Sequence, residues 1–223
     1  MKHVMRSMLL GMLGLLIAAN TTMAQQRSFR SQTALIICDV LLLNQEKSEK
    51  VIAAYDEVRQ ALRDQGGRPD FQSMSDDERV KYFEKRQKDT ADALKKELKD
   101  TLSEKELEAM ETVMMQRIYT PVAELRGLRQ VELKEDQCSE IQPLAIALSK
   151  KIVPGGSRFM GQPMDEAERE KAEKAFAEAK KDFIAKVTAI LSEEQNASWK
   201  ENTSAAQKEI DEMMERRRNF QRQ

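Results

Sequence analysis

The chain has 223 residues, of which 37 are Lys or Arg and 38 are Asp or Glu, so its formal net charge is −1 and the charge balance argues against a nucleic-acid partner. Charged residues make up 34% of the sequence and aromatic residues only 5%, which is the usage of amphipathic helices and not of sheets. Apolar residues recur at helical spacing, which argues against a disordered chain, and the predicted fold class is therefore all-α with no sheet.

The first 24 residues have the pattern of a secretory signal peptide. A basic start precedes an uncharged apolar run at 8–19, and Ala24 ends a triplet with small residues at the two positions that signal peptidase inspects. The run is shorter than the about 20 residues that span a bilayer. We therefore predict export to the periplasm, cleavage after Ala24 and one continuous mature domain at 25–223 without an integral membrane segment; an uncleaved anchor is the alternative.

Four copies of one short motif follow. Each has a Leu, a polar residue at the position of a helix cap, two more polar residues, and then Gln or a substitute for it, with an apolar residue eight positions after the Leu. The copies begin at Leu43, Leu102, Leu133 and Leu191. The first two leucines are 59 positions apart and the last two are 58 apart, so the chain is predicted to hold two tandem repeats of antiparallel helices, 35–118 and 125–212.

The motif predicts helix starts. Ser103 with Glu106, and Ser192 with Gln195, have the spacing of a capping box, in which the Ser oxygen accepts from an N–H of the first turn and the Glu or Gln reaches back to the cap. The Leu closes the apolar stripe of the preceding helix. The residues to which this structural role is assigned are Leu43, Leu102, Ser103, Glu106, Leu133, Gln137, Leu191, Ser192 and Gln195.

The first motif of each repeat departs from the pattern, because Lys134 stands where the cap belongs and Lys47 where its return partner belongs. Ser75 with Glu78, and Asp165 with Glu168, repeat the capping signature before the long helices. The helices expected are 44–64, 75–101 and 103–118 in the first repeat, and 134–152, 165–190 and 192–218 in the second. Gly/Pro linkers are expected at 64–72 and 153–163, a joint at Pro121, and a kink or interruption at Pro143.

Catalytic chemistry is not indicated. His3, the only histidine, belongs to the predicted signal peptide, so the exported chain would lack the side chain that most often does acid and base work and binds transition metals. No Gly-rich phosphate loop, Gly-x-Ser-x-Gly elbow or Cys-x-x-Cys occurs in the sequence. We predict that the protein is not an enzyme, with no catalytic residue, no metal site and no cofactor.

Leucine-led boxes at helix starts, on an exported and highly charged helical chain, resemble the Spy/CpxP family of periplasmic proteins, which carry an LTxxQ motif. Leu191, Ser192 and Gln195 match that motif well, and the other three copies match it in part. The resemblance implies a curved helical cradle and a role as an ATP-independent chaperone or as a modulator of envelope-stress signalling. Family members carry two boxes and usually pair, so four boxes imply a monomer that is a single-chain pseudo-dimer. The zinc link of some relatives is not transferred, because no histidine follows His3.

Two sets of side chains have two interpretations each. Cys38 and Cys138, the only cysteines, are expected either to form a disulfide between the repeats or to be two buried free thiols. Six side chains are candidates for a client-binding surface, with core packing as the alternative, because flexible thioethers suit promiscuous binding. They are Met110, Met114, Met115, Trp199, Met213 and Met214.

Two functions follow. The first is a protein that shields apolar segments of unfolded or partly folded envelope proteins without ATP. The second is a helical regulatory or structural module that docks one specific envelope partner, such as a sensor domain. Neither involves nucleic acid or catalysis.

Overall fold

The computed structural model describes residues 32–66, 69–115, 121–152 and 165–221. These residues form helices and connecting turns and contain no strand, which confirms the predicted all-α fold. The predicted signal peptide, its cleavage site and the linker at 153–163 lie outside the described residues. Within the described ranges no helix is both long enough and apolar enough to cross a membrane.

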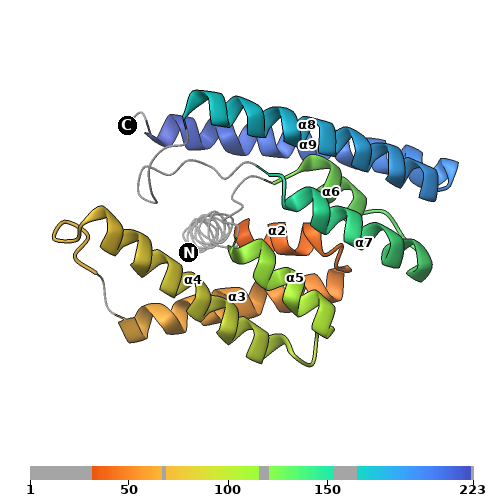
Figure 1. Ribbon diagram of the computed structural model, residues 1–223. Coiled ribbons are helices and arrows are strands. Elements are labelled where there is room, and N and C mark those ends of the chain that lie inside the picture. Colours follow the sequence, from red (N-terminus) through yellow and green to blue (C-terminus); the bar gives the residue numbers. More distant parts are fainter. Residues whose placement is uncertain (1–31, 67–68, 116–120, 153–164, 222–223) are drawn as a thin grey trace, which may run out of the picture. The chain divides into compact units, whose positions relative to one another are not determined.

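Eight helices occupy the described residues (Figure 1). They are α2 (Gln32–Val40), α3 (Gln45–Gly66), α4 (Asp76–Leu98), α5 (Glu104–Met115), α6 (Ala123–Arg129), α7 (Glu135–Ser149), α8 (Glu166–Ile190) and α9 (Glu193–Gln221). Six of them begin within one residue of the predicted starts, because each start carries a side-chain cap or a partial cap. Helix α7 runs through Pro143 without the interruption considered from the sequence. The tandem duplication itself stays a prediction.

The sequence pattern missed α2 and α6, the short helices that precede the first motif of each predicted repeat. They have nine and seven residues, which is too short for a helical period to stand out in the sequence. In α2 six residues are buried, including both Ile36 and Ile37. A helix that is apolar on all sides belongs in the core, and helix periodicity cannot reveal it.

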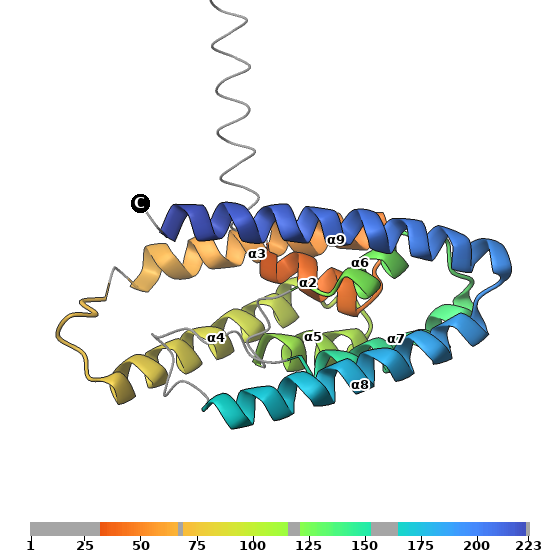
Figure 2. The ribbon, with the colours of Figure 1, turned by 90° about the horizontal axis from the view of Figure 1, so that it is seen from above.

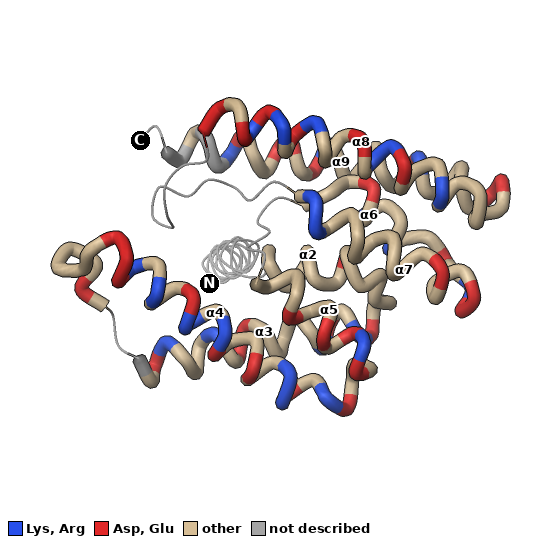
Figure 3. The backbone as a smooth tube through the Cα atoms, in the orientation of Figure 1, with Lys and Arg blue, Asp and Glu red and all other residues tan. Residues whose placement is uncertain are grey.

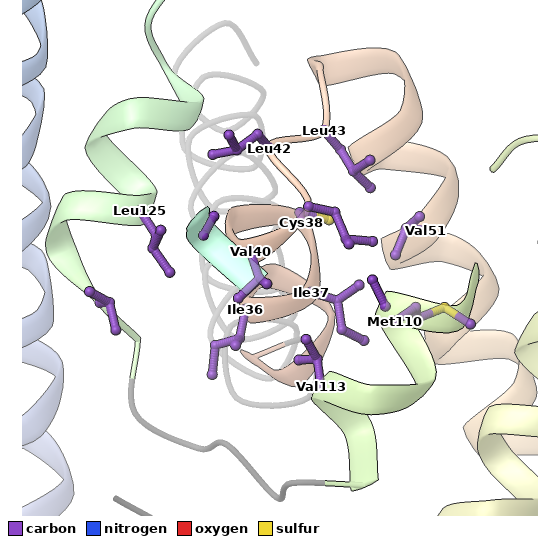
Figure 4. Close-up of a cluster of buried hydrophobic side chains, with 14 of the residues drawn as sticks. Ile36, Ile37, Cys38, Val40, Leu42, Leu43, Val51, Met110, Val113 and Leu125 are labelled. Atoms are coloured by element: carbon purple, nitrogen blue, oxygen red, sulfur yellow. The ribbon is translucent and has the colours of Figure 1, made fainter. Parts of the chain in front are cut away.

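The hydrophobic core is built around α2. Ile37 lies toward Met110 and Val113 of α5, while Leu125 of α6 faces the opposite side of α2 (Figure 4). Ile37 and Met110 are both fully buried. One large cluster of buried residues joins α2 to helices of both predicted repeats, and a second, small cluster lies between α6 and α9.

A buried ion cluster adds polar contacts to that core. Asp39 of α2 has only 2% of its surface exposed, and its carboxylate accepts from the Nε of Arg129 at 2.7 Å and from the Nε of Arg126 at 3.1 Å. A guanidinium N–H of Arg129 also donates to Ser48 Oγ at 3.4 Å. Asp39 and Arg129 are 90 positions apart, as are Leu43 and Leu133, so they take matching places in the two predicted repeats.

The end of α2 directs the chain into the first motif. Leu42 has a φ of 51°, and the N–H of Leu43 donates to the carbonyl of Cys38 at 3.1 Å. This six-residue hydrogen bond around a left-handed residue is a Schellman ending, which more often has Gly in that place. Because Leu42 is only 8% exposed, burial of its side chain offsets the cost of the left-handed backbone.

Helices α6 and α9 approach each other closely at one glycine. A Cβ placed on Gly127 would lie 2.6 Å from the backbone nitrogen of Thr203 and 2.7 Å from its Cα. Both distances are far shorter than van der Waals contact, so only glycine fits there. Next to this approach, Ala206 and Ile210 of α9 are buried in one cluster with Ala123 of α6.

Candidate functional site

The four motifs contact each other in two pairs. In each half of the chain, the fifth residue of the first motif meets the fifth residue of the second. Lys47 Nζ lies 3.0 Å from Glu106 Oε1, and the side-chain amides of Gln137 and Gln195 bond to each other at 2.9 Å. We call the first pair the ionic clasp and the second the amide clasp. The spacings of 59 and 58 that indicated a repeat are also the separations within these pairs.

The amide clasp satisfies both glutamines completely. Gln137 Oε1 accepts from the backbone N–H of Lys134 at 3.1 Å as well as from the Gln195 amide. Gln195 Oε1 accepts from the backbone N–H of Ser192 at 3.0 Å as well as from the Gln137 amide. Each side chain therefore caps its own helix and holds its partner at the same time.

The remaining amide hydrogens of this clasp reach the turn before the opposite helix. Gln137 Nε2 donates to the carbonyl of Ile190 at 3.1 Å, and Gln195 Nε2 donates to the carbonyl of Glu132 at 2.8 Å. The two contacts are reciprocal, since each carbonyl belongs to the residue before the motif Leu. Together they fix the start of α7 against the start of α9.

The ionic clasp divides the capping work differently. Asn44 Oδ1 accepts from the backbone N–H of Lys47 at 2.9 Å, which provides the cap without a return bond. Glu106 accepts from the N–H of Ser103 at 2.7 Å, and the Glu106 N–H donates to Ser103 Oγ at 3.3 Å. The ammonium of Lys47 takes no part in capping and lies 3.0 and 3.1 Å from the two Glu106 oxygens.

These contacts set the ionisation of Glu106. Partial burial pushes its pKa upward, but hydrogen bonds from Ser103 and from Lys47 outweigh burial and hold the pKa of the carboxyl below its ordinary 4.5. Such a carboxylate stabilises the fold above the unfolded-state pKa, and this contribution is lost as the pH falls through the folded-state pKa. The ionic clasp therefore weakens in acid, below about pH 4.5, whereas the amide clasp has no titrating group.

We expect Glu106→Gln to lower the free energy of unfolding at pH 7 by about 1 kcal/mol, because the Lys47 ammonium loses its charged partner. Urea unfolding followed by circular dichroism at pH 7 and pH 3 measures it. The difference in the free energy of unfolding between this variant and the unsubstituted chain is expected to be smaller at pH 3, where Glu106 of the unsubstituted chain becomes protonated.

The double variant Lys47→Gln/Glu106→Gln is the matched control, since it introduces the glutamine pair of the amide clasp into the first half. It is expected to be more stable than Glu106→Gln at pH 7. Its free energy of unfolding is expected to fall less between pH 7 and pH 3 than that of the unsubstituted chain. A double variant no more stable than the single one would contradict the pairing of the motifs.

The candidate client-binding residues separate by burial. Three of them, Met110, Met114 and Trp199, are 0%, 3% and 4% exposed, which agrees with the core-packing interpretation. Met115 is 43% exposed at the end of α5. Met213 and Met214 are half-buried on α9, and Met214 packs against the small cluster formed between α6 and α9.

Both cysteines are free thiols in this structure. Cys38 is buried and its Sγ donates to the carbonyl of Ser48 at 3.8 Å, and burial raises the pKa of this thiol to about 11. Cys138 is half-buried, and burial followed by the charge of Glu106 raises its pKa, against the opposing effect of Lys47. Both thiols are therefore protonated at neutral pH, a form that reacts slowly.

Trp199 joins three helices. Its indole Nε1 donates to the carbonyl of Glu124 in α6 at 2.9 Å, and its ring meets Phe183 of α8 edge to face, with centroids 6.3 Å apart. The carboxylate of Glu124 is in turn held by Lys180 of α8 at 2.7 Å. Trp199 thus anchors the first turns of α9 against both neighbours.

Beyond this anchor, α8 and α9 separate along their length (Figure 2), and a groove of about 790 Å³ opens beside them. Trp199 and Ile184 line its apolar part. Ile184 is 36% exposed, which is unusual for so large an apolar side chain in the described residues. The other lining residues are Glu124, Thr188, Lys200, Thr203, Ser204, Gln207, Lys208, Asp211, Glu212 and Glu215.

The groove continues along α8. Two smaller hollows share Phe176 and Lys180, and one of them also contains Ile184. Phe176, Lys180, Ile184 and Thr188 follow one another at four-residue spacing and therefore share a face of the helix. Sequence reasoning missed this face, although the spacing of Phe176 and Ile184 by eight residues was a usable signal.

No group of three or more His, Cys, Asp or Glu side chains is arranged to hold a metal ion in the ranges that the structure describes. The groove is lined instead by apolar, amide, hydroxyl and charged side chains of both signs. Such a surface suits contact with another polypeptide.

Comparison with known proteins gives no relative. No family model, curated protein or solved structure matches this chain.

Proposed function

We propose that this protein is a non-enzymatic helical binding protein of the cell envelope, acting as an ATP-independent chaperone of Spy/CpxP type. The observation that carries the proposal is the open groove beside α8 and α9, with apolar side chains in it and charges around it. Export to the periplasm and a monomeric, pseudo-dimeric state belong to the same proposal.

The groove has the properties that broad and weak recognition of unfolded chains requires. Ile184 is exposed and lines the groove together with the buried Trp199, so an apolar side chain of a client gains burial on entering. Charged residues of both signs also line the groove, and both signs occur along α8 and α9 (Figure 3). Such a mixture supports weak attraction to many sequences, because apolar burial and charges of either sign can each contribute to binding.

The proposal predicts suppression of aggregation without ATP. Several unrelated proteins, diluted from denaturant, are expected to scatter less light when the protein is present at stoichiometric amounts. Ile184→Glu is expected to reduce this suppression severalfold, because a charge replaces the exposed apolar contact.

Ala185→Glu is the matched control, since Ala185 is an exposed neighbour on α8 that does not line the groove. It is expected to leave suppression unchanged. Equal suppression of aggregation by the two variants would show that the groove does not take part in this function. One tight partner with no suppression of any client would instead favour the regulatory module.

A further inference from the structure

The charges along the groove are sorted by sign. Lys200 and Lys208 line the part nearer the start of α9, and Asp211, Glu212 and Glu215 line the part nearer its end. We propose that the groove takes an amphipathic helical segment with an acidic first turn and a basic last turn, lying parallel to α9. The inference rests on the proposed function and names the class of segment that the groove selects.

The dimensions agree with one such segment. Lys200 and Glu215 are fifteen residues apart on a continuous helix, which corresponds to about 22 Å. A helical segment of about four turns has the same length, and it would place one apolar stripe over Ile184 and Trp199. Acidic residues at the start of a helix and basic residues at its end also complement its own dipole.

The local ion pairs leave this sorting in place. Glu124 is compensated by Lys180 at 2.7 Å, and Glu212 has Arg216 at 3.9 Å. Asp211 accepts a hydrogen bond at 2.9 Å from the neutral side-chain amide of Gln207, which brings no opposite charge. The positive charges of Lys200 and Lys208 and the negative charges of Asp211 and Glu215 therefore determine the direction of a bound helix.

Trp199 reports binding directly, because it is the only tryptophan of the chain and lines the groove. The probes are two synthetic helical peptides without tryptophan and with the same apolar stripe. One begins with Glu and ends with Lys, and the other has the same composition in the reverse charge order. Since their net charges are equal, general electrostatic attraction cannot distinguish them.

Titration of the full chain, followed by Trp199 fluorescence, is expected to give a Kd about tenfold lower for the peptide that begins with Glu. A variant in which the groove charges are reversed is expected to prefer the other peptide. This result would show that the preference comes from the charges of the groove and not from a difference in helicity between the peptides. The substitutions of this variant are Lys200→Glu, Lys208→Glu, Asp211→Lys and Glu215→Lys. All four positions are exposed, and circular dichroism checks that the variant is folded.

A control variant makes the same exchange on exposed positions of α4 and is expected to keep the original preference. Its substitutions are Lys88→Glu, Lys96→Glu, Asp92→Lys and Glu97→Lys. Equal Kd values for both peptides would overturn the directional inference and leave the proposed function standing. Binding of neither peptide would overturn both. If the Trp199 emission per molecule changes with protein concentration in the absence of peptide, the groove binds a second copy of the chain, which would overturn the inference.

Discussion

Replacing Asp39 by Ala is expected to lower the free energy of unfolding by about 3 to 5 kcal/mol, because two guanidinium groups then lose their buried counter-charge. Arg126 and Arg129 have side-chain exposures of only 11% and 18%, so water cannot fully replace the carboxylate. This loss is a large part of the about 5 to 15 kcal/mol that stabilises a typical domain. Urea unfolding at pH 7, followed by circular dichroism, measures the effect.

Two further variants keep this prediction testable if Asp39→Ala fails to fold. Asp92→Asn removes an exposed carboxylate on α4 and is expected to change stability by less than about 0.5 kcal/mol. The triple variant Asp39→Leu/Arg126→Met/Arg129→Leu removes the whole cluster and is expected to recover much of the loss, since apolar residues of similar size replace buried ion pairs well. A triple variant less stable than Asp39→Ala would contradict the account.

Gly127→Ala is expected to destabilise the fold by about 3 kcal/mol, the upper part of the usual range for overpacking. In most helix interiors this substitution is favourable by up to about 1 kcal/mol, so even the sign of the effect is informative. The new methyl group would meet backbone atoms of Thr203, and α9 must move to make room.

Because the obstacle is backbone, shortening the opposite side chain is expected not to help. Thr203→Ala removes the Oγ1 atom, which lies 2.5 Å from the position that the methyl carbon would take, but retains the nitrogen and Cα. The double variant Gly127→Ala/Thr203→Ala is therefore expected to be no more stable than Gly127→Ala. Thermal unfolding of the three variants decides this, and full rescue would show that only the side chain stands in the way.

Local chemistry explains which parts of the fold were predictable. Ser75 and Glu78 form a capping box at the start of α4, with Ser75 N–H donating to Glu78 at 2.8 Å, and Asp165 Oδ1 accepts from the N–H of Glu168 at 2.7 Å before α8. These contacts involve residues three positions apart, so they can be predicted from the sequence alone. They account for the agreement between predicted and observed helix starts.

Contacts between distant helices were not predictable in the same way. The motif leucines indicated a spacing, but nothing in that spacing showed that Gln137 and Gln195 would meet each other. Helical periodicity does place Met110 and Met114 on one face, and both are buried, whereas the adjacent Met115 is exposed. The groove depends on how far α8 and α9 separate, and amphipathic stripes contain no information on that angle.

The position of α2 has a consequence for synthesis of the chain. Its apolar side chains leave the ribosome early, yet Leu125 and Leu128, which are buried in the same cluster, follow about ninety residues later. At about 5 to 20 residues per second, the side of α2 that α6 covers stays open for several seconds or more. A short apolar stretch rich in isoleucine and valine is prone to aggregate while it is exposed, so the interval before α6 emerges is when this face of α2 is most open to aggregation.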